Sequence, residues 1–176
     1  DLNDFFIYNR DNFYLERDRD LYPSKTLCFS VKEESRDAFF RDNKIWFKRN
    51  NQYIPVIEAS RLNIIGIHNI QNVMAALLMV FAIFDKKGIE INYQKAAEAC
   101  YSFKGLEHRM EFAGTIKGRT FVNDSKATTI GAVEMAVKSI KDKGILIIGG
   151  RTKGDDYSRL ADIVRDKARA IVLIGE

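Results

Sequence analysis

The alternation of apolar runs with helical patterns in the second half of the chain is the feature that most constrains its fold. Beyond Gly105 the expected order is strand, strand, helix, strand, helix, strand, over residues 110–115, 120–122, 129–141, 145–148, 157–165 and 170–174. Strands rich in Ile and Val that alternate with helices are typical of parallel sheets covered by helices. The sequence therefore predicts an α/β fold with a parallel sheet in this region.

The first half of the chain shows a β pattern of a different kind. Between Thr26 and Ile67 the apolar residues alternate with polar ones, and a turn signal at Asn50-Asn51 separates two β-type runs, over residues 44–47 and 53–57. A further β-type run covers residues 5–8. Runs joined by short turns pair in an antiparallel manner. We therefore expect a small antiparallel sheet here.

Two helices are expected between these regions. From Asn69 the apolar residues recur at helical spacing until Gly88, which suits a helix C-cap. Asn92 is the expected N-cap of a second helix, which ends at Gly105. The change of pattern at this glycine predicts a domain boundary, with one domain over residues 1–105 and another over residues 106–176.

Composition argues against several classes of function. The chain of 176 residues is 46% hydrophobic, which is enough to bury a core, and its net charge of +4 is spread along the sequence. Dispersed charge of this kind argues against nucleic-acid binding. Cys28 and Cys100 have no CxxC partner and suit reduced thiols in the cytoplasm. The 2 histidines have no metal-ligand spacing, so no dedicated transition-metal site is expected.

No membrane segment is expected either. The longest apolar stretch, Val73 to Phe84, is shorter than the roughly 18 residues that a membrane-spanning helix needs. The chain opens without a basic segment followed by an apolar run. Both ends adjoin β-type runs, and a domain seldom stops on an unshielded strand. We therefore expect a cytoplasmic protein of which this chain is one piece.

The segment Asn123-Asp124-Ser125-Lys126-Ala127-Thr128, between an expected strand and an expected helix, concentrates the most chemistry. A strand-to-helix junction directs backbone N–H groups and the helix dipole at anions. The plain alternative is a set of side chains that cap the helix. Lys126 favours a ligand site, because a lysine in the first turn opposes the helix dipole unless an anion compensates it. A phosphorylated or carboxylated ligand is the expected partner.

Two further clusters offer polar groups to a nucleotide. Asn69 and Asn72 stand three residues apart at a helix start, so they share a face. Asn69 would serve simply as an N-cap, but two amides that face one way also suit an adenine edge. Arg109 lies near the predicted domain boundary, where it is either a surface charge or a clamp for a phosphate.

A glycine-rich stretch, residues 149–156, follows the expected strand at 145–148. Glycines after a parallel strand allow a ligand to approach the backbone closely, at the strand end where α/β folds bind ligands. An ordinary glycine-rich turn would have the same composition. No Gly-Lys dipeptide occurs in the chain, so a GxxxxGK[ST] phosphate loop is absent from it. Any nucleotide site in these residues is therefore incomplete.

In their order along the chain, these clusters resemble the Mur ligases of peptidoglycan synthesis. The resemblance rests on Gly66-x-His68-Asn69-x-x-Asn72 with Ala75-Ala76, Gly105-Leu106-x-His108-Arg109-x-Glu111, Asn123 to Thr128, and Gly149-Gly150-x-x-Lys153-Gly154-x-Asp156. The Asp-Ser-Lys-Ala-Thr string resembles the members that add D-glutamate, whereas sister ligases resemble Asp-Tyr-Ala-His-x-Pro or Asp-Gly-Ala-His-Asn-Pro there. Three residues depart from the family pattern, namely Glu107 for proline, Thr129 for asparagine and Thr152 for aspartate.

The resemblance implies a particular architecture. Residues 1–105 would be the C-terminal part of a central ATP-binding domain with a small antiparallel sheet. Residues 106–176 would be the first half of a Rossmann-like C-terminal domain with a parallel sheet. The N-terminal domain, the phosphate loop and the Mg²⁺ ligands would then lie upstream. The isolated fragment is accordingly expected to be inactive.

The resemblance also implies an activity, that of an ATP-dependent ligase which joins D-glutamate to UDP-N-acetylmuramoyl-L-alanine through an acyl phosphate. ATP and Mg²⁺ would be its cofactors. Carried over position by position, the implied residues are Lys126 and Arg109 for catalysis, Asn69, Asn72, Arg109 and Asp124 for ATP, and Thr128 and Lys153 for the carboxylates of D-glutamate.

Two other hypotheses stay open. A related amide ligase with a different amino acid would keep Asn69, Asn72 and His108-Arg109, but the Asp-Ser-Lys-Ala-Thr string speaks against it. A non-catalytic α/β ligand-binding module would explain the absent phosphate loop. The sequence predicts no particular oligomeric state.

Overall fold

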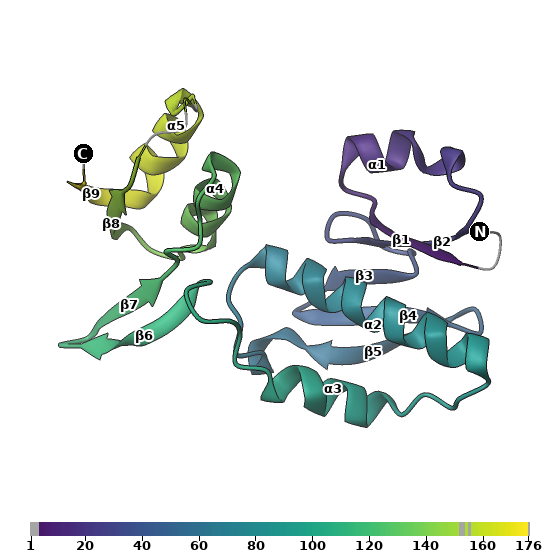
Figure 1. Ribbon diagram of the computed structural model, residues 1–176. Helices are drawn as coiled ribbons and strands as arrows, with labels where there is room; N and C mark the ends of the chain where they lie inside the picture. The colour runs from purple at the N-terminus through teal and green to yellow at the C-terminus, as the bar shows by residue number, and fades with distance from the viewer. Residues whose placement is uncertain (1–3, 152–153, 155, 176) are drawn as a thin grey trace. The chain divides into compact units, whose positions relative to one another are not determined.

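The computed structural model describes residues 4–151, 154 and 156–175. The chain divides into two units, each with its own strands and helices (Figure 1). Unit 1 comprises Asp1–Asn63 and Ile67–Lys104, and unit 2 comprises Ile64–Gly66 and Gly105–Glu176.

The sheet of unit 1 contains five strands in the order β1-β2-β3-β4-β5. These are β1 (Phe5–Asn9), β2 (Lys25–Ser30), β3 (Ala38–Arg41), β4 (Lys44–Arg49) and β5 (Gln52–Glu58). The first three strands run parallel to one another, whereas β3 with β4 and β4 with β5 are antiparallel pairs. The predicted antiparallel pairing is thus confirmed for β4 and β5. For β2 it is wrong, because this strand pairs in parallel with β1 and β3, and the sheet is mixed.

Two tight turns join the antiparallel strands. Asp42 and Asn43 link β3 to β4, and Asn50 and Asn51 link β4 to β5, with φ angles from 48° to 60°. Asn and Asp enter this left-handed region more readily than other residues that carry a side chain, and they favour two-residue hairpin turns. The turn predicted at Asn50-Asn51 is confirmed. Strand β3 was not predicted, because its 4 residues are too few to show a period.

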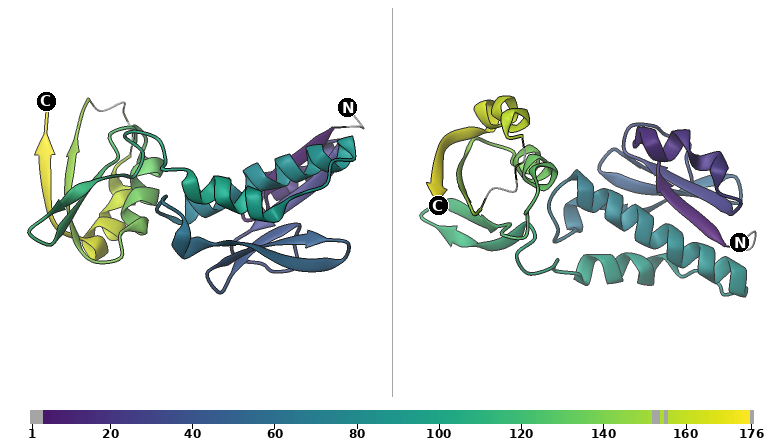
Figure 2. Two further views of the ribbon diagram at one scale, coloured as in Figure 1. Left: turned by 90° about the horizontal axis from the view of Figure 1, so that it is seen from below. Right: turned by 45° about the horizontal axis from the view of Figure 1, so that its top comes forward.

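Helices α2 (Ile67–Lys87) and α3 (Tyr93–Ser102) form a layer over the strands of unit 1. In the left view of Figure 2 the two helices are teal. α2 buries one face, made of Ile70, Val73, Met74, Leu77, Leu78, Phe81 and Ala82. Phe81 meets Phe47 of β4 edge to face, with ring centroids 5.1 Å apart. The whole helix is long and apolar enough, by length and composition, to cross a membrane, so the length of the apolar stretch alone was a wrong argument. Its buried face packs in the core instead.

Short helical segments complete unit 1. Asn12 caps α1 (Phe13–Arg17), accepting hydrogen bonds from two backbone N–H groups, and 3-10 turns occur at Arg19–Leu21 and Ala59–Arg61. The predicted cap of α3 is confirmed, because the Asn92 side chain accepts a hydrogen bond of 2.9 Å from the N–H of Lys95.

Unit 2 contains a β-hairpin followed by a β-α-β arrangement. Its elements are β6 (Glu111–Ile116), β7 (Arg119–Asn123), α4 (Ile130–Ser139), β8 (Gly144–Gly149), α5 (Ser158–Lys167) and β9 (Ala168–Ile174). β8 and β9 pair in parallel, as predicted, whereas β6 and β7 form a separate antiparallel sheet. Only Lys117 and Gly118 separate β6 from β7, and a parallel pair needs a much longer crossover connection.

Both cysteines are half-buried free thiols, as the sequence predicted. Burial raises the pKa of Cys28 and of Cys100, which keeps both thiols protonated.

Candidate functional site

The segment Asn123–Thr128 connects the end of β7 to the start of α4. Its backbone turns tightly, through two hydrogen bonds of 2.8 and 2.9 Å between residues of the segment. The cap of α4 is Thr129, whose hydroxyl accepts a hydrogen bond of 3.3 Å from the N–H of Ala132. Capping of the helix therefore does not account for the polar side chains of the segment.

The loop before β6 folds back against this segment. The Oδ1 atom of Asp124 accepts a hydrogen bond of 3.1 Å from the N–H of Met110. The N–H of Lys126 donates a hydrogen bond of 3.1 Å to the carbonyl oxygen of His108. These two bonds hold the two stretches side by side, so the structure brings the predicted residues Arg109, Asp124 and Lys126 onto neighbouring stretches of unit 2.

Three residues of the loop have a left-handed backbone, namely Gly105 with φ 87°, His108 with φ 65° and Met110 with φ 45°. Glycine adopts this conformation freely, but residues with a side chain do so at a cost. His108 is compensated by the hydrogen bond of 2.8 Å from its N–H to Oε2 of Glu111, and Met110 by its bond to the segment.

Asn123 joins the loop, β6 and the segment. Its Oδ1 atom accepts a hydrogen bond of 3.1 Å from the N–H of Ser125. Its Nδ2 atom lies 2.8 Å from Nδ1 of His108 and 3.4 Å from Oε2 of Glu111. Sequence reasoning gave neither Asn123 nor Glu111 a role, and the only signal for them was their place in the two motifs.

The predicted anion-binding side chains lie on the outside of this arrangement. Arg109, Lys126 and Thr128 are exposed, and within the described part of the chain their side chains form no hydrogen bond or ion pair. A guanidinium, an ammonium and a hydroxyl on stretches held together suit a phosphate or a carboxylate. The arrangement can therefore bind an anionic ligand.

The two predicted adenine-binding amides lie in unit 1. The Nδ2 atom of Asn72 donates a hydrogen bond of 3.3 Å to Oδ1 of Asn69, so the two side chains share a face as predicted. α2 begins at Ile67, which makes Asn69 its third residue, so the alternative in which Asn69 serves only as the N-cap does not hold. The helix starts earlier because Gly66, with φ 102°, turns the chain ahead of it.

The glycine-rich stretch after β8 is explained in part by packing. A Cβ atom at Gly149 would lie 2.2 Å from the carbonyl oxygen of Ile174, so the neighbouring strand β9 excludes any side chain there. The carboxylate of Asp156 accepts a hydrogen bond of 2.9 Å from the N–H of Ser158, at the start of α5. The predicted D-glutamate ligand Lys153 lies outside the described residues.

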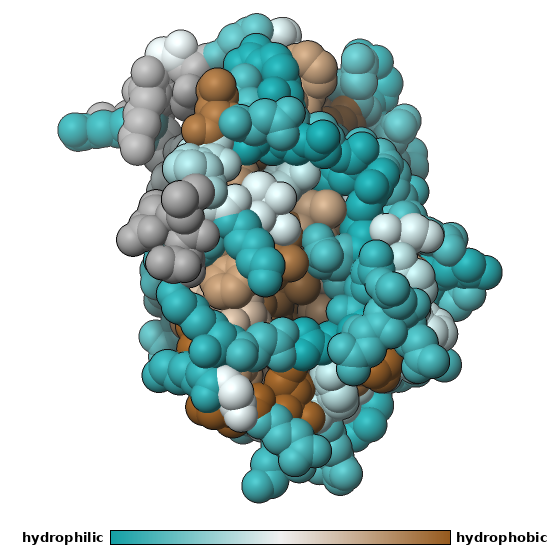
Figure 3. All heavy atoms as spheres, turned by 90° about the vertical axis from the view of Figure 1, so that its right-hand side faces the viewer, coloured by the Kyte–Doolittle hydropathy of each residue, from teal (hydrophilic) through white to brown (hydrophobic). Residues whose placement is uncertain are grey.

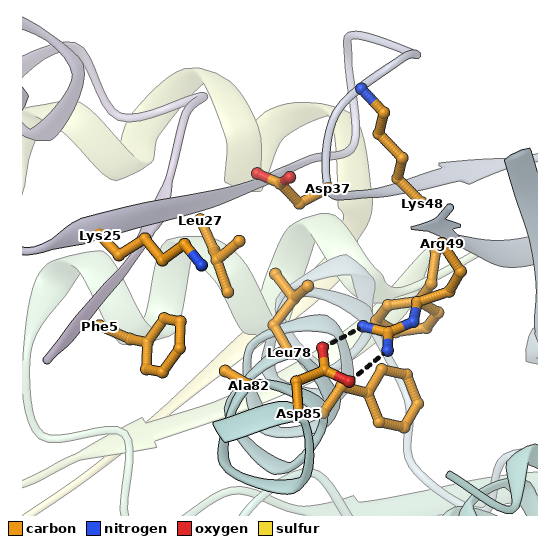
Figure 4. A pocket seen from close by; sticks show the side chains of 11 residues that line it. Phe5, Lys25, Leu27, Asp37, Lys48, Arg49, Leu78, Ala82 and Asp85 are labelled. Carbon is orange, nitrogen blue, oxygen red and sulfur yellow. Dashed lines mark hydrogen bonds and ion pairs between the residues drawn. The ribbon is translucent and has the colours of Figure 1, made fainter. Parts of the chain in front are cut away.

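A hollow of about 120 Å³ lies in unit 1, beside the last turns of α2 (Figure 4). Leu27, Leu78 and Ala82 contribute its apolar lining, and Arg49 and Asp85 form a bidentate ion pair in its wall. Figure 3 shows one face of the protein, on which hydrophobic residues lie in a depression rimmed by hydrophilic ones. The hydrogen bonds from Arg49 lower the pKa of Asp85. None of the predicted site residues line this hollow, and these two charges satisfy each other.

Carboxylate, thiol and imidazole groups are the side chains that bind metal ions in proteins. In the part of the chain that the structure describes, no three His, Cys, Asp or Glu side chains form a group that could hold a metal ion. Mg²⁺ prefers carboxylate and phosphate oxygens.

Comparison with known proteins connects this site to a family. Residues 108–176 match the family model described as Mur ligase, glutamate ligase domain. The UDP-N-acetylmuramoylalanine–D-glutamate ligase of Chloroherpeton thalassium is 34% identical over 189 residues, which cover 99% of this chain and 39% of the relative. The ligase of the same name from Geotalea daltonii is 35% identical over 176 residues, covering 99% of this chain and 37% of the relative. The chain thus spans less than two fifths of the length of these relatives.

Solved structures of ligases share the fold of the chain. MurF ligase from Thermotoga maritima in complex with ADP has a TM-score of 0.63 at 15% identity, covering 98% of this chain and 44% of that one. MurF from Acinetobacter baumannii has a TM-score of 0.61 at 17% identity, covering 98% of this chain and 39% of that one. At these identities the likeness shows the fold alone.

Proposed function

We propose that this chain, which belongs to the Mur ligase family, is part of an ATP-dependent ligase that adds D-glutamate to UDP-N-acetylmuramoyl-L-alanine in peptidoglycan synthesis. The observation that carries the proposal is the cluster in unit 2, where Arg109, Asp124 and Lys126 lie on two stretches joined by hydrogen bonds. The choice of D-glutamate is supported by relatives whose names state that amino acid. Such an enzyme would act in the cytoplasm.

The two units would serve different parts of such an enzyme. Unit 1 would be the later part of a central ATP-binding domain, and unit 2 the first part of the C-terminal domain. The match of residues 108–176 to a glutamate ligase domain supports the second assignment. The mixed sheet covered by α2 and α3 agrees with the first.

The reaction would proceed in two steps. The γ-phosphoryl group of ATP passes to the substrate carboxylate, which gives an acyl phosphate and ADP. The amine of D-glutamate then attacks the acyl carbon, and phosphate leaves. Negative charge grows on the phosphoryl oxygens and on the tetrahedral centre, so cations placed beforehand stabilise both transition states. Arg109 and Lys126 are two exposed cations suited to that role.

The nucleoside would be recognised by groups of complementary chemistry. Oδ1 of Asp124 accepts the N–H of Met110, so the other carboxylate oxygen is available to the ribose hydroxyls. Asn69 and Asn72, which share a face of α2, would bind the adenine edge. Thr128 and Lys153 would bind the carboxylates of D-glutamate. Mg²⁺ would accompany the ATP phosphates, and we assign its ligands to none of the described residues.

A ligation assay tests this function. The full-length product of the reading frame that contains this chain is incubated with ATP, Mg²⁺ and UDP-N-acetylmuramoyl-L-alanine, and with D-glutamate, L-glutamate or diaminopimelate in parallel. We expect phosphate release and product formation to depend on D-glutamate. A preference for another amino acid would identify a sister ligase, and ATP binding without ligation would favour a non-catalytic module.

A further inference from the structure

We infer that Glu111 and Asn123 are positioning residues, which fix the loop before β6 and the segment after β7 so that Arg109 and Lys126 act together on one anionic ligand. This inference rests on the proposed function and names residues that the reaction scheme above leaves without a role. We call the hydrogen-bonded group of His108, Glu111 and Asn123 the loop clamp.

The first element of the loop clamp is the carboxylate of Glu111. Its Oε2 atom accepts a hydrogen bond of 2.8 Å from the N–H of His108, whose φ of 65° is unfavourable for a residue with a side chain. The carboxylate therefore stabilises a backbone conformation that the chain would otherwise leave. Arg109 follows directly, and its backbone direction depends on that conformation.

The second element is the amide of Asn123. Because its Oδ1 atom accepts the N–H of Ser125, its Nδ2 atom must be the group that faces Nδ1 of His108 and Oε2 of Glu111. An amide nitrogen only donates, so Nδ1 of His108 must accept. The network therefore favours the tautomer of His108 whose proton lies on Nε2.

The loop clamp acts on the site from both sides. On one side the carbonyl oxygen of His108 receives the N–H of Lys126 at 3.1 Å, and on the other the N–H of Met110 reaches Asp124 at 3.1 Å. Arg109 stands between these two anchored residues. The separation of the exposed cations Arg109 and Lys126 therefore depends on the backbone of His108 and Met110, which the loop clamp holds in place.

Substitutions of Glu111 distinguish a positioning role of its carboxylate from the effect of its negative charge alone. In the full-length enzyme, Glu111→Ala should lower kcat/KM for ATP by about 10- to 100-fold, because a hydrogen bond to a charged acceptor is lost. Glu111→Gln keeps an acceptor oxygen for the N–H of His108 and should stay within about threefold of the unsubstituted enzyme. Glu107→Ala is the matched control, since it removes an exposed carboxylate from the same loop. Equal effects of Glu111→Ala and Glu107→Ala would overturn the inference.

Nitrogen NMR tests the loop clamp independently of the reaction. With ¹⁵N-labelled histidine in the full-length protein, the signals missing from a His108→Ala variant identify His108. We expect an unprotonated Nδ1 and a protonated Nε2 at neutral pH, and mixed tautomers in Asn123→Ala. A protonated Nδ1 in the unsubstituted protein would overturn the loop clamp whichever amino acid is ligated. An unprotonated Nδ1 in a protein that does not use D-glutamate would instead count against the proposed function alone.

Discussion

Asp124 has two proposed tasks, and two substitutions separate them. One carboxylate oxygen accepts a hydrogen bond of 3.1 Å from the N–H of Met110, which is a structural contact inside unit 2. The other oxygen is proposed to bind the ribose hydroxyls of ATP. Asp124→Ala removes both oxygens. Asp124→Asn keeps an acceptor for Met110 and replaces the second oxygen by an amide nitrogen.

The structural contact sets the expected stability effects. A hydrogen bond to a charged acceptor contributes about 1.5–3 kcal/mol, and the half-exposed setting of Asp124 places its loss in Asp124→Ala at about 1–2 kcal/mol. Asp124→Asn retains the acceptor and should change the free energy of unfolding by less than about 0.5 kcal/mol. For ATP, loss of the charged acceptor should raise KM by about tenfold or more in both variants.

The assay is phosphate release by the full-length enzyme at varied ATP concentration, with thermal melting in parallel. Asp142→Asn provides the control, since this carboxylate is exposed in the same unit. The expected pattern is a normal melting temperature with a raised KM for ATP in Asp124→Asn. A KM within about twofold of the unsubstituted enzyme in that variant, with Asp124→Ala destabilised, would show that Asp124 serves the loop and not the nucleotide.

Three further predictions concern the core, an ion pair and the amino-acid substrate. Phe81→Ala removes a ring that is 2% exposed and should lower the free energy of unfolding of unit 1 by about 3–5 kcal/mol, measured by urea unfolding through Trp46, the single tryptophan. Hydrogen bonds from Arg49 lower the pKa of Asp85 below its ordinary 3.8, so the stabilisation by this pair is complete above that pH and is lost as pH falls further. Asp85→Asn should therefore flatten the pH dependence of unfolding below about pH 4, and an unchanged slope would contradict this. Lys153→Ala should raise the KM for D-glutamate by about tenfold or more and leave that for ATP unchanged, and an unchanged KM for D-glutamate in the ligation assay would refute the assigned role.

Local signals in the sequence were sufficient for much of the fold. The helical spacing of apolar residues identified α2, because one buried face runs the length of that helix. Asn92 and the pair Asn50-Asn51 specify their cap and turn through their own side chains and backbone preferences. The parallel pairing of β8 with β9 followed from the helical segment between them, which provides the crossover connection.

Pairings that depend on distant residues were not predictable in the same way. Residues 5–9 carry no local signal that β1 pairs in parallel with β2, because the pairing partner of a strand depends on which other strand lies beside it after folding. The start of α2 was placed near Asn69, which is a good N-cap residue, whereas the helix begins at Ile67, directly after Gly66. The position of the helix start thus follows the turn at Gly66 and not the capping preference of Asn69.

The motif that contains His108 and Glu111 is recognisable in the sequence, but the hydrogen bonds of the loop clamp are not. Met110 is not a residue that predicts a left-handed backbone, and a single histidine at position 108 is only a weak signal for one, so the loop had little local signature of its shape. That shape depends on a carboxylate three residues ahead and on an amide fifteen residues ahead, which the hairpin of β6 and β7 returns to the loop. The hairpin therefore does more than join two strands, because its length determines whether Asn123 reaches His108. A one-residue change in the turn at Lys117 and Gly118 would shift that register and separate Arg109 from Lys126 without altering either cation.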